Sequence, residues 1–270
     1  MRSMEKRTRS AGTKLTEGEY ERLERAAGAT IRGDAALGSR GSGGVPHHVT
    51  QRGNNRQQVF FSDQQRRLYL ATLAGYATRN QLQILGYCLM PNHIHAVVVP
   101  QLQTSMGHSF GRAHSAYSRY FNRTRNRSGH LWQNRFYSAP LDRPRLLAAL
   151  RYVDLNPVRA RMTDHAESYG WSSATAHLTG RDPFGLIDPA VWEALCPAGG
   201  WKDMLQPARG SDEEWAQRLR AATHSGKPLG SQGLIEQMDR LAGYFLVWRR
   251  DLEISRDWVE LVSGKLAGRL

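Results

Sequence analysis

The order of strand-like and helix-like segments over residues 47–153 is the sequence feature that most constrains the fold. Strand-like segments lie at residues 47–51, 82–89, 93–99 and 135–141, and helical apolar spacing covers 62–78, 105–122 and 142–153. The resulting order is β-α-β-β-α-β-α. It predicts an α+β fold with a ferredoxin-like (split β-α-β) antiparallel sheet and helices packed on one face.

Local signals support the ends of two of these helices. Ser62 followed by Gln65 forms a capping-box pattern, and Asp142 precedes an apolar stripe that runs through Leu146 and Leu150. The helix over 105–122 places Phe110, Ala113, Tyr117 and Tyr120 on its apolar face.

The rest of the chain predicts two flanking regions. Residues 1–43 are basic and then glycine-rich, which predicts a disordered or weakly helical appendage with a short helix over 17–27. Residues 44–178 form the predicted main domain. Residues 179–270 have helical patterning, so we expect a helical C-terminal region with tryptophan packing anchors: Trp192, Trp201, Trp215 and Trp248.

Composition excludes several classes of protein. Cys88 and Cys196 are the only cysteines, no apolar run is long enough for a membrane span, and the first residues lack a signal-peptide core. We therefore expect a cytoplasmic protein that does not enter a membrane. The net charge is +13, and the stretch from Val45 to Ala176 carries 16 Arg, no Lys and 5 acidic residues. Such a basic, arginine-rich segment favours a nucleic-acid partner.

His93 and His95 are candidate metal ligands. They follow the Met90-Pro91-Asn92 turn at the start of a predicted strand, so their side chains project from the same face. Two imidazoles about 7 Å apart on a rigid strand can share one metal ion, provided that a third ligand comes from elsewhere. The alternative is a pair of ordinary histidines on a polar face.

Tyr152 and Asn156 form a second candidate pair, four residues apart on a predicted helix. A tyrosine beside a cation can act as a nucleophile, and an amide oxygen can complete the coordination of a hard metal. Because Asn156 precedes Pro157, the helix can also end there, and Tyr152 can simply pack at its edge. Three further tyrosines are rival nucleophiles: Tyr117, Tyr120 and Tyr137.

Several segments together resemble one family. They are Tyr-Cys-Leu-Met-Pro-Asn-His-Ile-His (87–95), Arg-Tyr-Val-Asp-Leu-Asn-Pro-Val-Arg-Ala (151–160), His-Val-Thr-Gln-Arg-Gly-Asn-Asn-Arg (48–56), Gly-His-Leu-Trp-Gln-Asn-Arg-Phe (129–136) and Trp-Ser-Ser (171–173). In this order they resemble the single-tyrosine transposases of the HUH superfamily, in the group of REP-associated tyrosine transposases and IS200-like transposases. The resemblance covers about residues 44–178, and residues 207–242 more weakly resemble the C-terminal region of longer members.

The resemblance implies a DNA transposase that nicks and rejoins single strands through a 5′-phosphotyrosine, with a divalent metal, Mg²⁺ or Mn²⁺, as its cofactor. His93 and His95 match the metal-binding histidines, Tyr152 the nucleophile, and Asn156 a polar position that helps to bind the metal. The expected partner is single-stranded or hairpin DNA, and the expected state is a monomer or homodimer. Candidate DNA-binding residues are Arg52, Asn54, Arg56, Arg112, Arg119, His130, Trp132, Gln133, Arg135 and Arg159.

Two alternatives remain open at this level. One is a catalytically inactive protein that binds DNA or RNA on the same sheet. The other is a hydrolytic His-x-His metalloenzyme, which would depend on Zn²⁺ and form no covalent adduct. For Trp132, a role as a core anchor is as well supported as stacking on a base. The chain departs from the family pattern in residues 1–43 and after about residue 243.

Overall fold

A computed structural model describes residues 44–196, 200–206 and 212–245. The helix predicted over residues 17–27 lies outside these ranges, as do Trp248 and the last residues of the predicted C-terminal region. The described residues belong to one compact unit.

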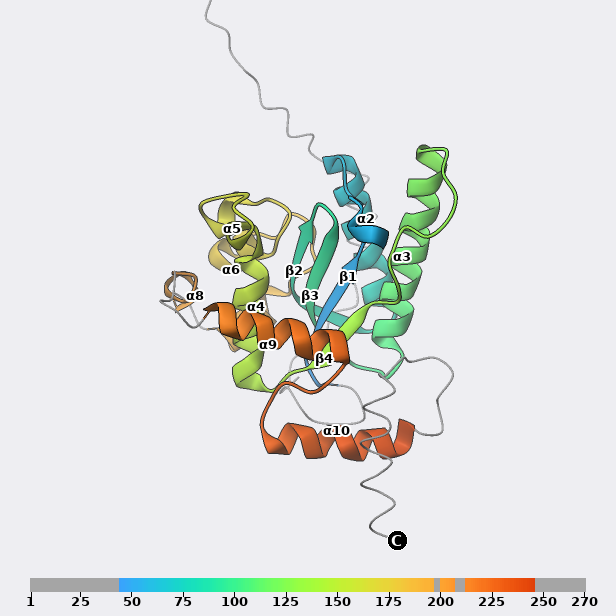
Figure 1. The fold of residues 1–270 in the computed structure, drawn as a ribbon. Coiled ribbons are helices and arrows are strands. Elements are labelled where there is room, and N and C mark those ends of the chain that lie inside the picture. The colour runs from blue at the N-terminus through green and yellow to red at the C-terminus, as the bar shows by residue number, and fades with distance from the viewer. Residues whose placement is uncertain (1–43, 197–199, 207–211, 246–270) are drawn as a thin grey trace, which may run out of the picture. The chain divides into compact units, whose positions relative to one another are not determined.

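Four antiparallel strands form the sheet at the centre of this unit (Figure 1). They are β1 (His47–Arg52), β2 (Leu82–Met90), β3 (His93–Pro100) and β4 (Tyr137–Pro140), in the order β2-β3-β1-β4. This order, with a helix between β1 and β2 and another between β3 and β4, confirms the predicted split β-α-β arrangement. The fourth strand is shorter than the predicted 135–141 segment.

Helices α2 (Asp63–Arg79) and α3 (Ser105–Thr124) make the two crossovers and lie on the same side of the sheet (Figure 1). Ser62 caps α2 by accepting a hydrogen bond from the Gln65 amide, as its position predicts. The Gln65 side chain, however, accepts from the Phe61 amide, one residue before the cap. An aromatic cluster fills the interior beside these helices: Phe60, Tyr69, Tyr117 and Trp132.

The structure adds a second helical layer on the opposite face of the sheet. It begins with α4 (Arg143–Asp154), which Asp142 caps through a hydrogen bond from the Arg145 amide, and continues with α5 (Asn156–Arg159), η2 (Ala166–Ser168) and α6 (Ala174–Thr179). Gly86 on β2 permits the close approach of this layer. A Cβ atom at that position would lie 2.7 Å from a Leu150 methyl carbon.

Short helices confirm the predicted helical C-terminal region: α7 (Pro189–Leu195), α8 (Gly200–Met204), α9 (Asp212–Ser225) and α10 (Gln232–Phe245). Helix α9 packs along β4 and also contacts β1 (Figure 1). Trp192, Trp201 and Leu219 belong to the same hydrophobic core as the sheet, so residues on both sides of the predicted boundary at 178 share one core. None of the helices in the described ranges is long and apolar enough to cross a membrane.

Candidate active site

The candidate site lies on the sheet face that α4 covers. In the register of the sheet, His95 pairs with Thr50 and His93 with Arg52, so all four side chains share one face. The ring centroids of His93 and His95 are 5.0 Å apart. The structure adds a third imidazole, because His48 on β1 stacks on His95 with ring centroids 5.2 Å apart.

Hydrogen bonds occupy one ring nitrogen of each candidate ligand. Nδ1 of His93 lies 2.6 Å from Oδ1 of Asn92, whose Nδ2 donates to the Arg56 carbonyl oxygen. Because this amide oxygen can only accept, His93 donates from Nδ1. Nδ1 of His95 lies 3.0 Å from Nε2 of His48. Within the described residues, Nε2 of His93 and Nε2 of His95 make no hydrogen bond.

Burial keeps these imidazoles neutral. It lowers the pKa of His48 to about 3 and, together with the positive charge of Arg52, the pKa of His93 to about 4. Burial also lowers the pKa of His95 well below its ordinary value, and the neighbouring histidines and arginines lower it further. The neutral ring is the form that binds a metal ion.

Tyr152 reaches the histidines from helix α4. Its ring lies edge-on to His95 and His48, with centroid distances of 5.4 and 5.8 Å, and its side chain is only 4% exposed. The guanidinium carbon of Arg159 lies 4.0 Å from the centre of the Tyr152 ring, and the same guanidinium donates to the Tyr152 carbonyl oxygen. The structure therefore brings together the three residues that the sequence singled out as the metal pair and the nucleophile.

Helix α9 adds a charged group beside the phenol. Burial lowers the pKa of Arg220, but hydrogen bonds to Glu213 and to Tyr152 outweigh this effect and raise it. Arg220 also pairs with Glu213 at 2.6 Å. Arg220 therefore places a positive charge beside the Tyr152 side chain.

Asn156 lies just beyond the end of α4. The helix stops at Asp154, and Pro157 has no amide proton to donate to the preceding turn, yet Leu155 keeps helical dihedral angles. Asn156 is buried, and its Nδ2 atom has no hydrogen-bond partner in the described part of the chain. Within the described residues, Asn156 makes no hydrogen bond to His93 or His95.

The groups at this site can supply a divalent cation with two imidazole nitrogens and one amide oxygen. No group of three His, Cys, Asp or Glu side chains suited to a metal occurs among the residues that the structure describes. The two free Nε2 atoms supply lone pairs on one face of the sheet. The Asn156 amide has an orphaned polar atom, and its oxygen and nitrogen can exchange places by rotation of the amide, so it can present an oxygen without breaking a hydrogen bond.

The predicted DNA-binding residues fall into three groups. Arg52 is exposed at the end of β1, beside His93, and Asn54 and Arg56 follow in η1 (Asn54–Arg56). Arg112 and Arg119 are exposed on α3. The remaining exposed members lie in the loop that leads to β4: His130, Gln133 and Arg135.

Two members of the predicted DNA-binding set lie elsewhere. Trp132 is buried in the aromatic cluster and donates from Nε1 to the His114 carbonyl oxygen, so its ring is not available to a base. The structure supports its role as a core anchor, and we leave it out of the proposed interface. Arg159 covers Tyr152, as described above.

Comparison with known proteins identifies the sequence around this site. The family model "Transposase IS200 like" matches residues 44–156, which include His93, His95 and Tyr152. Residues 44–156 are therefore similar to the IS200-like transposases. A solved structure described as a REP-associated tyrosine transposase bound to a REP hairpin is 16% identical, with a TM-score of 0.42, over 58% of this chain and 90% of that chain. No curated protein matches the chain.

Sequence reasoning missed three residues around the candidate site: His48, Arg220 and Thr223, whose hydroxyl oxygen lies 2.7 Å from Nδ1 of His48. His48 shares a strand face with Thr50 and Arg52, so the alternation of β1 could have indicated it once β1 was placed beside β3. Thr223 and Arg220 come from α9, and no local signal in the sequence points to them. Both lie outside the segment that the family model matches.

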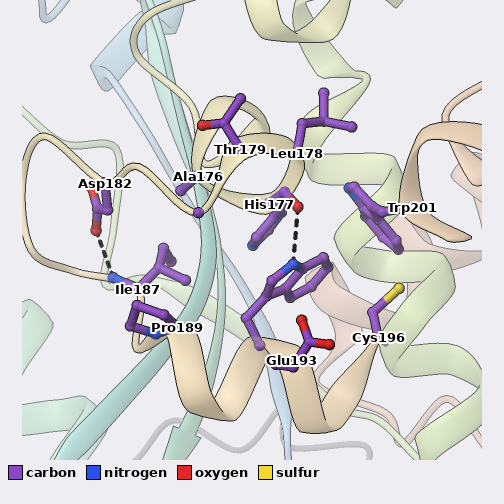
Figure 2. A pocket seen from close by; sticks show the side chains of 12 residues that line it. Ala176, His177, Leu178, Thr179, Asp182, Ile187, Pro189, Glu193, Cys196 and Trp201 are labelled. Atoms are coloured by element: carbon purple, nitrogen blue, oxygen red, sulfur yellow. Dashed lines mark hydrogen bonds between the residues drawn. The ribbon is translucent and has the colours of Figure 1, made fainter. Parts of the chain in front are cut away.

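A pocket lies apart from this site, between α6 and the helices α7 and α8 (Figure 2). His177 lines it and stacks on Trp192 with ring centroids 3.8 Å apart, while its carbonyl oxygen accepts from Trp192 Nε1. The ring nitrogens of His177 bind Asp154 and the Leu85 carbonyl oxygen. None of the residues lining this pocket belongs to the predicted site.

Proposed function

We propose that this protein is a DNA transposase that cuts and rejoins single-stranded DNA, at hairpin or repeat sequences, through a 5′-phosphotyrosine on Tyr152. The observation that carries the proposal is the contact between the Tyr152 ring and His95 of the His-x-His pair. The match of residues 44–156 to the IS200-like transposase family model supports it. We expect the protein to act on DNA in the cytoplasm.

His93, His95 and Asn156 would hold the metal. The two imidazoles would bind through Nε2, because hydrogen bonds already occupy Nδ1 of each ring. When bound, a divalent ion such as Mg²⁺ or Mn²⁺ polarises the scissile phosphate and stabilises the charge that develops on its oxygens.

Tyr152 performs the chemical step. Its phenol oxygen attacks the phosphorus in line, so that a tyrosine–phosphorus ester forms while the bond from phosphorus to the 3′ oxygen breaks. The phenol proton leaves to solvent and the departing 3′ oxygen takes up a proton, giving a free 3′-OH. A 3′-OH from another strand then attacks the phosphotyrosine and releases Tyr152. The ester conserves the phosphodiester bond energy, so joining needs no nucleotide cofactor.

The surrounding cations assist this step. Arg159 packs against the Tyr152 ring and fixes its position, while Arg220 interacts with the phenol from α9. The exposed arginines at the end of β1 and on α3 would contact DNA phosphates.

Formation of a covalent protein–DNA adduct tests the proposal. The full chain is incubated with hairpin-forming single-stranded DNA and Mn²⁺, and the adduct is measured on a denaturing gel. We expect an adduct with the wild type, loss of at least about 1,000-fold with Tyr152→Phe, and little change with Tyr120→Phe as the matched control.

Three other outcomes would contradict the proposal. An undiminished adduct in Tyr152→Phe would assign the nucleophile elsewhere. DNA binding without any adduct would favour an inactive nucleic-acid-binding protein. Zn²⁺-dependent cutting without an adduct would favour a hydrolytic metalloenzyme.

A further inference from the structure

A chain of buried hydrogen bonds connects helix α9 to the candidate metal ligand His95. The Thr223 hydroxyl lies 2.7 Å from the Leu219 carbonyl oxygen, one turn earlier on α9. Nδ1 of His48 lies 2.7 Å from the Thr223 hydroxyl oxygen, and Nε2 of His48 lies 3.0 Å from Nδ1 of His95. Thr223, His48 and His95 are all buried, so water does not compete for these contacts.

The chemistry of the groups fixes the direction of every bond in this chain. The Leu219 carbonyl can only accept, so the single hydroxyl proton of Thr223 points to it. The Thr223 oxygen must then accept from His48, which places the His48 proton on Nδ1. Nε2 of His48 is therefore an acceptor, and His95 must donate from Nδ1. The reverse direction would leave two oxygen atoms 2.7 Å apart with no proton between them.

We propose that Thr223 is a positioning residue that holds His95, through His48, in the tautomer that presents the lone pair of Nε2 to the metal site. This inference deepens the proposed function and rests on it for the role of the metal. It also gives α9 a part in the site, although α9 lies beyond the segment that the family model matches. Residues that orient metal-binding histidines in this way typically change metal affinity when replaced.

Thr223→Val tests the chain directly. Valine has nearly the shape of threonine but cannot accept the proton of His48, so that a buried N–H would lack a partner. We expect His48 to move its proton to Nε2 and donate to His95, which must then carry its own proton on Nε2. This proton occupies the position that the metal needs. Thr223→Ser keeps the hydroxyl and should retain the wild-type tautomers.

Two measurements on the full chain report the outcome. Long-range ¹H–¹⁵N NMR of the metal-free protein identifies which nitrogen of each imidazole carries the proton. We expect protons on Nδ1 of His48 and His95 in the wild type and in Thr223→Ser, and on Nε2 in Thr223→Val. Mn²⁺ affinity, measured from the electron paramagnetic resonance signal of free Mn²⁺, should fall about 10–100-fold in Thr223→Val and should have its wild-type value in Thr223→Ser.

Thr72→Val is the matched control. Thr72 also donates to a carbonyl one turn earlier, on α2, but it is half-buried and lies on the other side of the sheet from α4. It should leave both the tautomers and the Mn²⁺ affinity unchanged.

The proposal is overturned if His95 carries its proton on Nε2 in the wild type, or if Thr223→Val keeps the wild-type tautomers. Unaltered Mn²⁺ affinity in a Thr223→Val protein whose tautomers have changed would also overturn it. A wild type that has the expected tautomers but forms no DNA adduct would instead contradict the proposed function. The tautomer measurement therefore separates the two failures.

Discussion

Two histidine clusters lie on the same face of the sheet, and helix α4 contributes to both. In the first, His93 and His95 contact each other and Tyr152 packs on His95. In the second, Asp154 sits two residues after Tyr152 and binds Ser173 at 2.8 Å, His177 at 2.6 Å and Trp201 at 3.0 Å. Both clusters are buried, and both combine imidazole with other polar groups.

The clusters differ in how completely they use their hydrogen-bonding groups. Each oxygen of Asp154 has a hydrogen-bond partner, and both ring nitrogens of His177 are used, one by Asp154 and the other by the Leu85 carbonyl oxygen. In the first cluster, Nε2 of His93 and Nε2 of His95 have no partner among the described residues. The second cluster, which is saturated, stabilises the end of α4. The first cluster, with His93, His95 and Tyr152, has unused lone pairs that can bind a ligand, and we call it the open cluster.

Asp154→Ala should have the largest effect on stability. It removes the side chain that the buried Ser173, His177 and Trp201 side chains bind, and each buried group left without a partner costs about 1–3 kcal/mol in the free energy of unfolding. Urea denaturation measures this value. The control is Asp63→Ala, because the Asp63 side chain is exposed, lies 3.5 Å from Arg66 and should contribute less than about 1 kcal/mol. Equal losses in the free energy of unfolding for Asp154→Ala and Asp63→Ala would show that the Asp154 cluster does not have the stabilising role that distinguishes it from the first cluster.

His93→Gln should show the opposite pattern. His93 donates a single hydrogen bond at the half-buried edge of the site, so the free energy of unfolding should change by less than about 1 kcal/mol. Mn²⁺ affinity should fall by more than about 100-fold, because a ligand is lost rather than a residue that supports one. Calorimetric titration measures it, with the exposed His165→Gln as the control. Retained affinity would show that the open cluster does not bind metal.

A histidine outside both clusters should give the smallest effect, seen in the pH dependence of stability. Burial lowers the pKa of His114 to about 3, while the unfolded ring titrates near 6.5. Between these values only the unfolded state takes up the proton, so the free energy of unfolding falls as the pH is lowered. His114→Leu should make this fall shallower by up to about 1.4 kcal/mol per pH unit.

Denaturation between pH 7 and pH 4.5 measures the slope. The exposed His165→Gln should leave it unchanged. If His114→Leu has the wild-type slope, His114 does not remain neutral in the folded protein. Burial would then not be enough to keep an imidazole neutral, which would weaken the same conclusion for the histidines of the open cluster.

Much of the fold could be predicted from local patterns. The spacing of apolar residues predicted every strand, and Ser62 and Asp142 marked the starts of α2 and α4 because their side chains cap the first turn. The second layer on the sheet could not be predicted in this way. It depends on the side of the sheet to which α4 returns, and on Gly86, which permits close packing against Leu150.

The candidate site was predictable only where its residues are close in sequence. His93 and His95 share a strand face by alternation, and Tyr152 could be proposed through the family resemblance. The pairing of His48 with Thr223 joins residues 175 positions apart, so it depends entirely on the tertiary packing of α9. Trp132 shows the converse, since a tryptophan among arginines suits base stacking equally well until the core around it is seen.

The position of the DNA on the protein tests the central claim most directly. The full chain is incubated with hairpin-forming single-stranded DNA and Mn²⁺, the adduct is digested with protease and nuclease, and mass spectrometry locates the residue that carries the remaining nucleotide. The nucleotide should be linked through its 5′ phosphate to Tyr152. A nucleotide on any other residue, such as Tyr120 or Tyr137, would contradict the assignment of the open cluster as the site of DNA cleavage.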